Sequence, residues 1–160
     1  MEAKSMGDFK LDMKVGEQGE AVVLEYLKQM EFVESVEDVR SIKLFQEHDI
    51  DFLVYTKQAV IFPVEVKTDT MAHRTGNIAY EVYSNKHYGT KGCFEKTKAK
   101  YIYYYLVATK HLYQIDVQAL RRHIQSEYKG KRLIPMGDFA EGYLVKITEL
   151  ETHNIAKELF

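Results

Sequence analysis

Apolar residues recur along the chain with two different periods, and the period predicts where helices and strands lie. Between Lys14 and Met30 they recur every three or four positions, which is typical of an amphipathic helix. A second helix is predicted from Asp116 to Lys129, with Asp116 as its N-cap, and a short closing helix at Asn154–Phe160.

The other apolar runs are short and rich in β-branched and aromatic residues, so they predict strands. In chain order they are Ser41–Phe45, Asp49–Tyr55, Ala59–Lys67, Asn77–Ser84, Tyr101–Thr109 and Gly142–Thr148. The short turn Thr56–Gln58 joins the second and third runs into a hairpin. The order of these elements predicts an α/β fold, with a central mixed β-sheet flanked by helices. Because no linker or repeat interrupts the chain, we expect residues 1–160 to form a single domain.

Composition narrows the class of protein. The chain of 160 residues is 46% hydrophobic and 29% charged, and it has no apolar run of the roughly 20 residues that span a bilayer. The first residues lack the apolar segment of a secretory signal. The single cysteine, Cys93, excludes an internal disulfide and a cysteine-rich zinc site. We therefore expect a cytoplasmic protein with no membrane partner.

The net charge of −2 is not that of a protein that coats itself in nucleic acid. Bases are nevertheless concentrated between Lys67 and Lys100, whereas acids dominate before Glu65. This asymmetry fits a local basic surface, and it fits an ordinary solvated surface equally well.

Charged residues lie inside the two strands of the predicted hairpin. With the turn centred on Gln58, Asp51 lies directly opposite Glu65, and Asp49 opposite Lys67. Directly opposed Cβ atoms are about 4.5–5.5 Å apart, so two carboxylates there repel each other unless one is protonated or a cation lies between them. A hard divalent ion, Mg²⁺ or Mn²⁺, suits such an oxygen-only pair. The alternative is an exposed strand pair with a cross-strand salt bridge from Asp49 to Lys67.

A third carboxylate can come from the first predicted helix. Glu17 points about 140° away from the centre of its apolar stripe, whereas Glu20 lies on the border, about 80° from the centre. A border residue can contact both the sheet and a solvated cleft, which favours Glu20. Gly19 before it allows the helix to approach the sheet closely.

These pieces, "GEQGE", "DIDFLVY" and "PVEVKTDT", together resemble the PD-(D/E)XK nuclease superfamily over roughly Lys14 to Thr70. The layout is most similar to Holliday-junction-resolvase-like and phage-type members, although Ile50 stands where the family has a proline. The resemblance implies a restriction-endonuclease-like core and metal-dependent cleavage of DNA in recombination, repair or restriction. It also implies roles for the candidate site residues. Asp51 and Glu65 are expected to bind Mg²⁺ or Mn²⁺, Lys67 to orient or activate the attacking water, and Glu20 to assist the metal or water network.

The expected function is therefore a Mg²⁺-dependent nuclease acting on DNA. Phosphodiester hydrolysis needs a hydroxide nucleophile and neutralisation of developing charge, which metal ions and a lysine ammonium supply. Two alternatives remain: a non-catalytic nuclease-fold DNA-binding module of a larger assembly, and a ribonuclease of similar fold. A homodimer is expected if the protein resolves junctions, because two cuts require two sites. Asp49 remains a rival to Asp51 as ligand.

Substrate contacts are expected in the two segments that follow Lys67. Asn77 and Tyr80, on the predicted strand, are candidate substrate contacts, and Glu81 is a candidate ligand of a second ion; otherwise the three are edge-strand residues. The segment His87–Lys100 reads as a glycine-containing loop that mixes bases with aromatic residues, a composition suited to phosphate contacts and base stacking. Its candidate contacts are Lys91, Lys96 and Lys98.

Overall fold

The structure is a computed structural model that describes the backbone of residues 6–160 and the side chains from residue 13 onwards. Its elements are α1 (Met6–Gln29), β1 (Val33–Asp38), α2 (Lys43–Gln46), β2 (Phe52–Thr56), β3 (Ile61–Asp69), α3 (Ala72–Thr75), β4 (Asn77–Asn85), β5 (Thr90–Lys91), α4 (Cys93–Lys96), β6 (Tyr101–Leu106), β7 (His111–Asp116), α5 (Val117–His123), the π-helical turn η1 (Ile124–Tyr128), β8 (Ile134–Pro135), β9 (Glu141–Lys146), α6 (Ile147–Thr152) and β10 (Ala156–Glu158).

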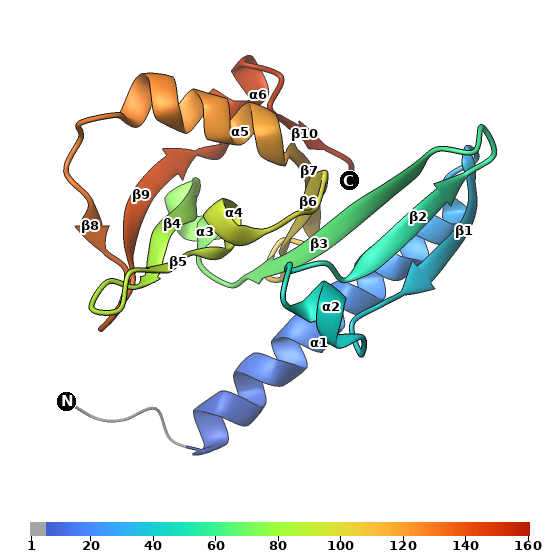
Figure 1. Ribbon diagram of the computed structural model, residues 1–160, viewed down its shortest axis with the longest axis horizontal. Helices are drawn as coiled ribbons and strands as arrows, with labels where there is room; N and C mark the ends of the chain where they lie inside the picture. The colour runs from blue at the N-terminus through green and yellow to red at the C-terminus, as the bar shows by residue number, and fades with distance from the viewer. Residues whose placement is uncertain (1–5) are drawn as a thin grey trace.

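The central sheet has six strands in the order β1-β2-β3-β6-β7-β10. Its strands pair antiparallel except for β3 and β6, which are parallel, so the sheet is mixed. A second sheet has the order β5-β4-β9-β8. Figure 1 shows α1 running alongside β1, β2 and β3, whereas α5 and α6 lie with β4 and β9 beside β6 and β7. The predicted α/β fold with a mixed central sheet flanked by helices is confirmed.

The central sheet is buried on both faces at β6. Tyr103 and Tyr105 pack into the cluster that α1 forms with β2 and β3. Ile102, Tyr104 and Leu106, which alternate with them, pack into a second cluster with α5, α6, β4 and β9. The aromatic run therefore belongs to the core on both sides, because successive side chains of a strand point to opposite faces. Among the described residues, no helix combines the length and the apolar character needed to cross a bilayer.

Helix α1 lies close to β3 at Gly19. A Cβ atom at this position would overlap the side chain of Thr68, whereas a Cβ at Gly16, one turn earlier, would meet no atom within 4 Å. Gly19 therefore sets the distance between the helix and the strand, as the sequence predicts. This close approach brings the side chain of the next residue, Glu20, towards the sheet.

The predicted strand Ser41–Phe45 is wrong, and β1 occupies that place in the sheet. Val33–Asp38 pairs with β2, and a register irregularity between Val33 and Ser35 breaks the alternation of apolar residues by which a strand is recognised. Residues 43–46 instead form α2, and the side chains of Ile42 and Leu44 are exposed there.

The closing segment is also not the predicted helix. Ala156–Glu158 forms β10, which pairs antiparallel with β7, and the helix lies just before it as α6. A short isolated helix is marginally stable, whereas an edge strand offers unpaired backbone groups to a passing segment. The strand Asn77–Ser84 exists as β4, but it belongs to the second sheet. Asp116 caps α5 as predicted, since its Oδ1 accepts a hydrogen bond from the amide of Ala119 at 2.7 Å.

Replacing Gly19 with Ala should destabilise the fold by about 1–3 kcal/mol, because the added methyl group overpacks the contact with Thr68. The matched control is Gly16→Ala in the same helix, which should stabilise by up to about 1 kcal/mol through helix propensity. Urea unfolding of both variants measures the difference, and Thr68→Ala in the Gly19→Ala background should restore part of the loss. Equal stabilisation by both alanines would contradict the close packing of α1 on β3.

Candidate functional site

The hairpin of β2 and β3 has the predicted register. Phe52 pairs with Val64 and Val54 with Phe62, as the turn centred on Gln58 predicts. The ladder of paired residues ends at Phe52, and the amide of Asp51 donates to the carbonyl of Val64 at 2.8 Å. Its Oδ2 accepts a hydrogen bond from the amide of Val66 at 2.7 Å. The carboxylate of Asp51 is thereby fixed against the backbone of β3 next to Glu65.

Glu65 is buried in the sheet, with 4% of its surface exposed. Its Oε1 lies 3.5 Å from the ammonium of Lys67, and its buried Oε2 has no hydrogen-bond partner among the described residues. Burial raises the pKa of Glu65 to about 7, and the charges of Asp49 and Asp51 add to this effect, although Lys67 and Thr97 oppose it. An unsatisfied buried carboxylate oxygen costs free energy unless the site holds a compensating group.

Asp51 is perturbed in the same direction. Burial raises the pKa of Asp51 to about 6, and the charge of Glu20 contributes to the rise. The amide of Val66 and the charges of Lys67 and Arg40 offset only part of it. Two neighbouring carboxyl groups with raised pKa values indicate a site where negative charge lacks full compensation.

Lys67 lies between Glu65 and Cys93. Burial lowers the pKa of Lys67, but its contacts with Cys93 and Glu65 outweigh burial, so the net pKa is raised and the ammonium stays protonated. Burial also raises the pKa of the Cys93 thiol to about 12. The thiol is therefore neutral near neutral pH and a poor nucleophile, and it would raise the pKa of Lys67 only where it ionises, so Glu65 is the carboxylate partner of the ammonium group. No local sequence pattern predicts this contact, because Cys93 is far from Lys67 along the chain.

Glu20 and Asp51 line the same pocket, a hollow of about 800 Å³ between α1 and the end of β1. The side chain of Glu20 is 26% exposed, which agrees with its predicted place on the border of the apolar stripe. Its Oε2 accepts a hydrogen bond from Nη1 of Arg40, whose Nε donates to Oδ1 of Asp38 at 2.9 Å. Sequence analysis missed Arg40, because it lies in the turn after the overlooked strand β1.

The structure also distinguishes Asp49 from Asp51. Asp49 has a positive φ of 48°, so the chain leaves the extended conformation before β2 begins. Its Oδ1 lies 2.9 Å from Nζ of Lys96. The alternative salt bridge from Asp49 to Lys67 is not formed, since the carboxylate partner of Lys67 is Glu65.

The carboxylates fit a metal ion in part. In the part of the chain that the structure describes, no group of three or more His, Cys, Asp or Glu side chains is arranged to hold a metal ion. Glu20 faces Asp51 across their pocket, but it is held by Arg40. The pair of Asp51 and Glu65 does offer oxygen ligands, and the unpartnered Oε2 of Glu65 is a free acceptor for a cation. The sequence thus found the acidic residues, but the three do not form a ready-made set of ligands.

The candidate substrate contacts have separate environments. The side-chain amide of Asn77 donates to the carbonyl of Thr75 at 3.0 Å, and Lys91 is exposed on β5. Lys96 is paired with Asp49, and Lys98 is exposed beyond α4.

The predicted substrate contact of Tyr80 needs correction. Its side chain is fully buried, its ring is stacked on Phe94 at 5.2 Å, and its hydroxyl donates to Glu95 at 2.6 Å. An inward position on β4 explains the error, because alternate residues of that strand face the core. Its neighbour Glu81 is only partly buried, and its charge acts on Cys93.

Comparisons with known protein families, characterised proteins and solved structures found no match for this chain.

The raised pKa of Glu65 predicts that metal-free protein loses stability as the pH rises. Glutamate has an ordinary pKa near 4.5, and in the folded protein the value is about 7, so the folded state binds more protons between these two pH values. Stability should therefore fall as the pH rises through this window and level off above it. In Glu65→Gln the fall should be smaller by up to about 3 kcal/mol.

Urea unfolding in EDTA at pH 5 and pH 8 measures this difference. The exposed residue Glu34 on β1 provides the control, since Glu34→Gln should keep the pH dependence of the wild type. If Glu65→Gln kept it too, Glu65 would not carry a raised pKa.

Proposed function

We propose that the protein is a metal-dependent nuclease that hydrolyses phosphodiester bonds of DNA, built on a restriction-endonuclease-like core. The observation that carries the proposal is the grouping of Asp51, Glu65 and Lys67 at one end of the β2–β3 hairpin. It joins two carboxyl groups of raised pKa, a buried oxygen without a partner, and a protonated ammonium group. Carboxylate ligands for a cation beside a fixed positive charge suit the hydrolysis of a phosphodiester.

The two carboxyl groups explain why a cation would be required. At neutral pH the pair is costly to ionise, because Glu65 is buried, Asp51 is partly buried, and each adds to the negative charge of the site. Mg²⁺ or Mn²⁺ held by Asp51 and Glu65 would supply Lewis-acid polarisation of the phosphate and a hydroxide at neutral pH. Glu20 could join only after it releases Arg40, so it would assist rather than anchor.

Lys67 contributes a fixed positive charge to this site. Its raised pKa keeps the side chain protonated, and Glu65 holds it within 3.5 Å. A preorganised ammonium group stabilises negative charge that develops on the phosphate oxygens, and it orients the attacking water by donating a hydrogen bond. Because the group stays charged, Lys67 acts as an electrostatic residue rather than as a general base.

Replacing Asp51 with Asn, or Glu65 with Gln, should lower the rate of Mg²⁺-dependent cleavage by at least about a hundredfold. The fold of both variants should be retained. The matched control is Asp49→Asn, which should cut at close to the wild-type rate, because Asp49 is bound to Lys96.

The assay compares plasmid, linear duplex, single strand, four-way junction and RNA, each with Mg²⁺, Mn²⁺ or EDTA. If only RNA were cleaved, the substrate would be RNA and not DNA. Binding without any cleavage would indicate a non-catalytic module. If Asp51→Asn kept full activity and Asp49→Asn lost it, the metal-binding role would belong to Asp49 and not to Asp51.

Replacing Lys67 with Met should lower the rate of cleavage by about a hundredfold and leave metal binding intact, because the ammonium stabilises the transition state but is no ligand. Single-turnover rates and the Mn²⁺ affinity of wild type and Lys67→Met separate the two effects. Lys57→Met, on the exposed turn after β2, is the control for loss of a surface charge. An unaltered rate in Lys67→Met would remove the catalytic role.

A further inference from the structure

Two hollows adjoin each other on the side of α5 and the following turn. The first, here called the η1 hollow, has a volume of about 680 Å³ and is lined by Val82, Glu95, Arg122, Ile124, Gln125, Ser126, Lys129 and Tyr143. The second, here called the β3 hollow, has about 350 Å³ and is lined by Pro63, Lys98, Ala99, Lys100, Asp116, Gln118 and Arg122. Arg122 lines both, so the two hollows form one continuous surface.

Positive charge exceeds negative charge on this surface. Lys98, Lys100, Arg122 and Lys129 are exposed, and none is in an ion pair with another described residue. The surface also has two carboxylates, and both have hydrogen-bond partners: Glu95 accepts from the hydroxyl of Tyr80, and Asp116 caps α5. Elsewhere Lys67, Lys86 and Lys96 are each paired with a carboxylate. The four unpaired bases therefore outnumber the two carboxylates of this surface, although the chain as a whole is slightly acidic.

The β3 hollow lies beside the candidate site. Pro63 and Glu65 are two residues apart on β3, so their side chains point to the same face of the sheet. Between them and α5 runs the segment from α4 to β6, which contains Thr97 and Lys98. Arg121 fixes this segment, since its Nε donates to the carbonyl of Phe94 and its Nη2 to the carbonyl of Thr97, both at 2.8 Å. The β3 hollow and Glu65 are therefore neighbours on one face of the sheet, on either side of a segment that Arg121 holds in place.

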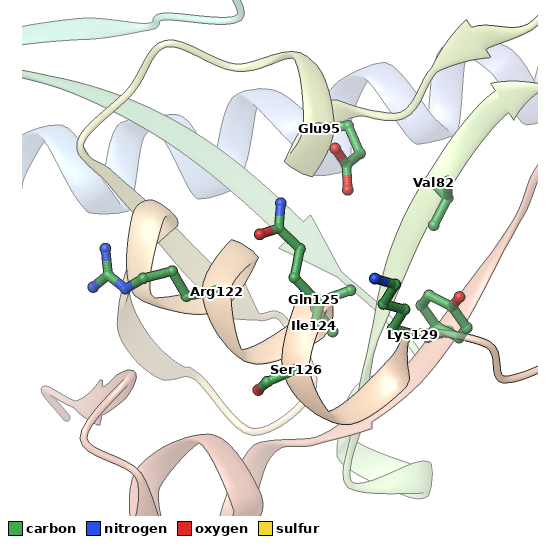
Figure 2. Close-up of a pocket in the computed structure, with 8 residues that line it drawn as sticks. Val82, Glu95, Arg122, Ile124, Gln125, Ser126 and Lys129 are labelled. Carbon is green, nitrogen blue, oxygen red and sulfur yellow. The ribbon is translucent and has the colours of Figure 1, made fainter.

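The η1 hollow has the lining of a base-binding pocket rather than of a purely ionic surface. Val82, Ile124 and Tyr143 provide apolar and aromatic contact. Figure 2 shows the side chains of Gln125 and Glu95 pointing toward one another, so an amide and a carboxylate are available to the edge of a base. In the same view Arg122 extends away from Lys129, which spreads the two positive charges along the surface. Stacking on an aromatic ring combined with separated phosphate contacts is typical of sites for single strands.

We propose that these two hollows form a track that binds a single-stranded segment of nucleic acid and leads it to the candidate site. An unpaired base occupies the η1 hollow, and successive phosphates contact Lys129, Arg122, Lys100 and Lys98. This proposal rests on the proposed nuclease function and deepens it by naming the class of substrate, a nucleic acid with an unpaired strand. Paired bases cannot enter the η1 hollow, because their faces are covered by neighbouring pairs.

The charge test uses the double variant Arg122→Gln/Lys129→Gln, with Lys57→Gln/Lys157→Gln as the matched control on exposed positions outside the track. Fluorescence anisotropy in EDTA measures the affinity for a labelled single-stranded DNA, the same sequence as RNA, and a blunt duplex, over a series of salt concentrations. The track variant should bind the single strand at least about tenfold more weakly. Its slope of log affinity against log salt should fall by about 1.4, since each lost phosphate contact removes about 0.7. The control should keep both values.

A second variant tests the stacking contact separately from charge. Tyr143→Leu should weaken binding of the single strand by about tenfold and leave the salt slope unchanged, because no phosphate contact is lost. Circular dichroism and the Tm identify any variant whose fold is damaged. Arg122 and Lys129 are exposed, so the charge variant should fold normally. It therefore still tests the track if Tyr143→Leu unfolds.

The outcomes separate this proposal from the proposed function. Unchanged single-strand affinity in the track variant would overturn the track, even if Asp51 and Glu65 prove essential for cleavage. Equal binding of duplex and single strand, with equal losses in the variant, would overturn the assignment to unpaired strands. Loss of single-strand binding in the track variant, together with full cleavage by Asp51→Asn, would support the track and remove the catalytic assignment. Comparing the affinities for DNA and RNA of the same sequence shows which of the two polymers the track prefers.

Discussion

The burial of Glu65 within β3 is the constraint that shapes the candidate site. A carboxylate inside a sheet is stable only as the neutral acid or beside a positive charge, and here one oxygen faces Lys67 while the other has no partner among the described residues. The strand cannot move this side chain outwards, because β3 is held on one side by β2 and on the other by β6. The charge is therefore fixed where the hairpin, Lys67 and the segment after α4 converge.

Much of this site follows from strand periodicity alone. Side chains alternate strictly along a strand, and a short turn fixes the register of a hairpin, so the pairing of β2 with β3, which brings Asp51 next to β3, can be predicted without any tertiary information. The border position of Glu20 follows in the same way from the helical period. In both cases the decisive geometry lies within a few residues or across a single turn.

The parts that could not be predicted depend on contacts between distant segments. Arg40 reaches Glu20 from a strand whose alternation is broken by a register irregularity, and Cys93 reaches Lys67 from α4. The sequence position of Tyr80 suggests a substrate contact. Its strand lies in a second sheet, however, and the ring points into the core. The last segment became a strand because the edge of β7 was open to it. The local sequence pattern cannot predict these contacts, because each depends on which distant segment packs against the residue in the folded protein.

Arg121 links the chemistry of the site to the hydrophobic core. It lies on α5 and holds the carbonyl groups of Phe94 and Thr97, one at each side of the end of α4. Phe94 is packed on Tyr80 in the interior, whereas Thr97 lies next to Glu65 and its hydroxyl donates to the carbonyl of Asp49 at 2.8 Å. One guanidinium group thus connects a packed helix to the acidic end of the hairpin. A substitution that shifts Arg121 would therefore disturb the surroundings of Glu65 and Asp49 without altering either carboxyl group.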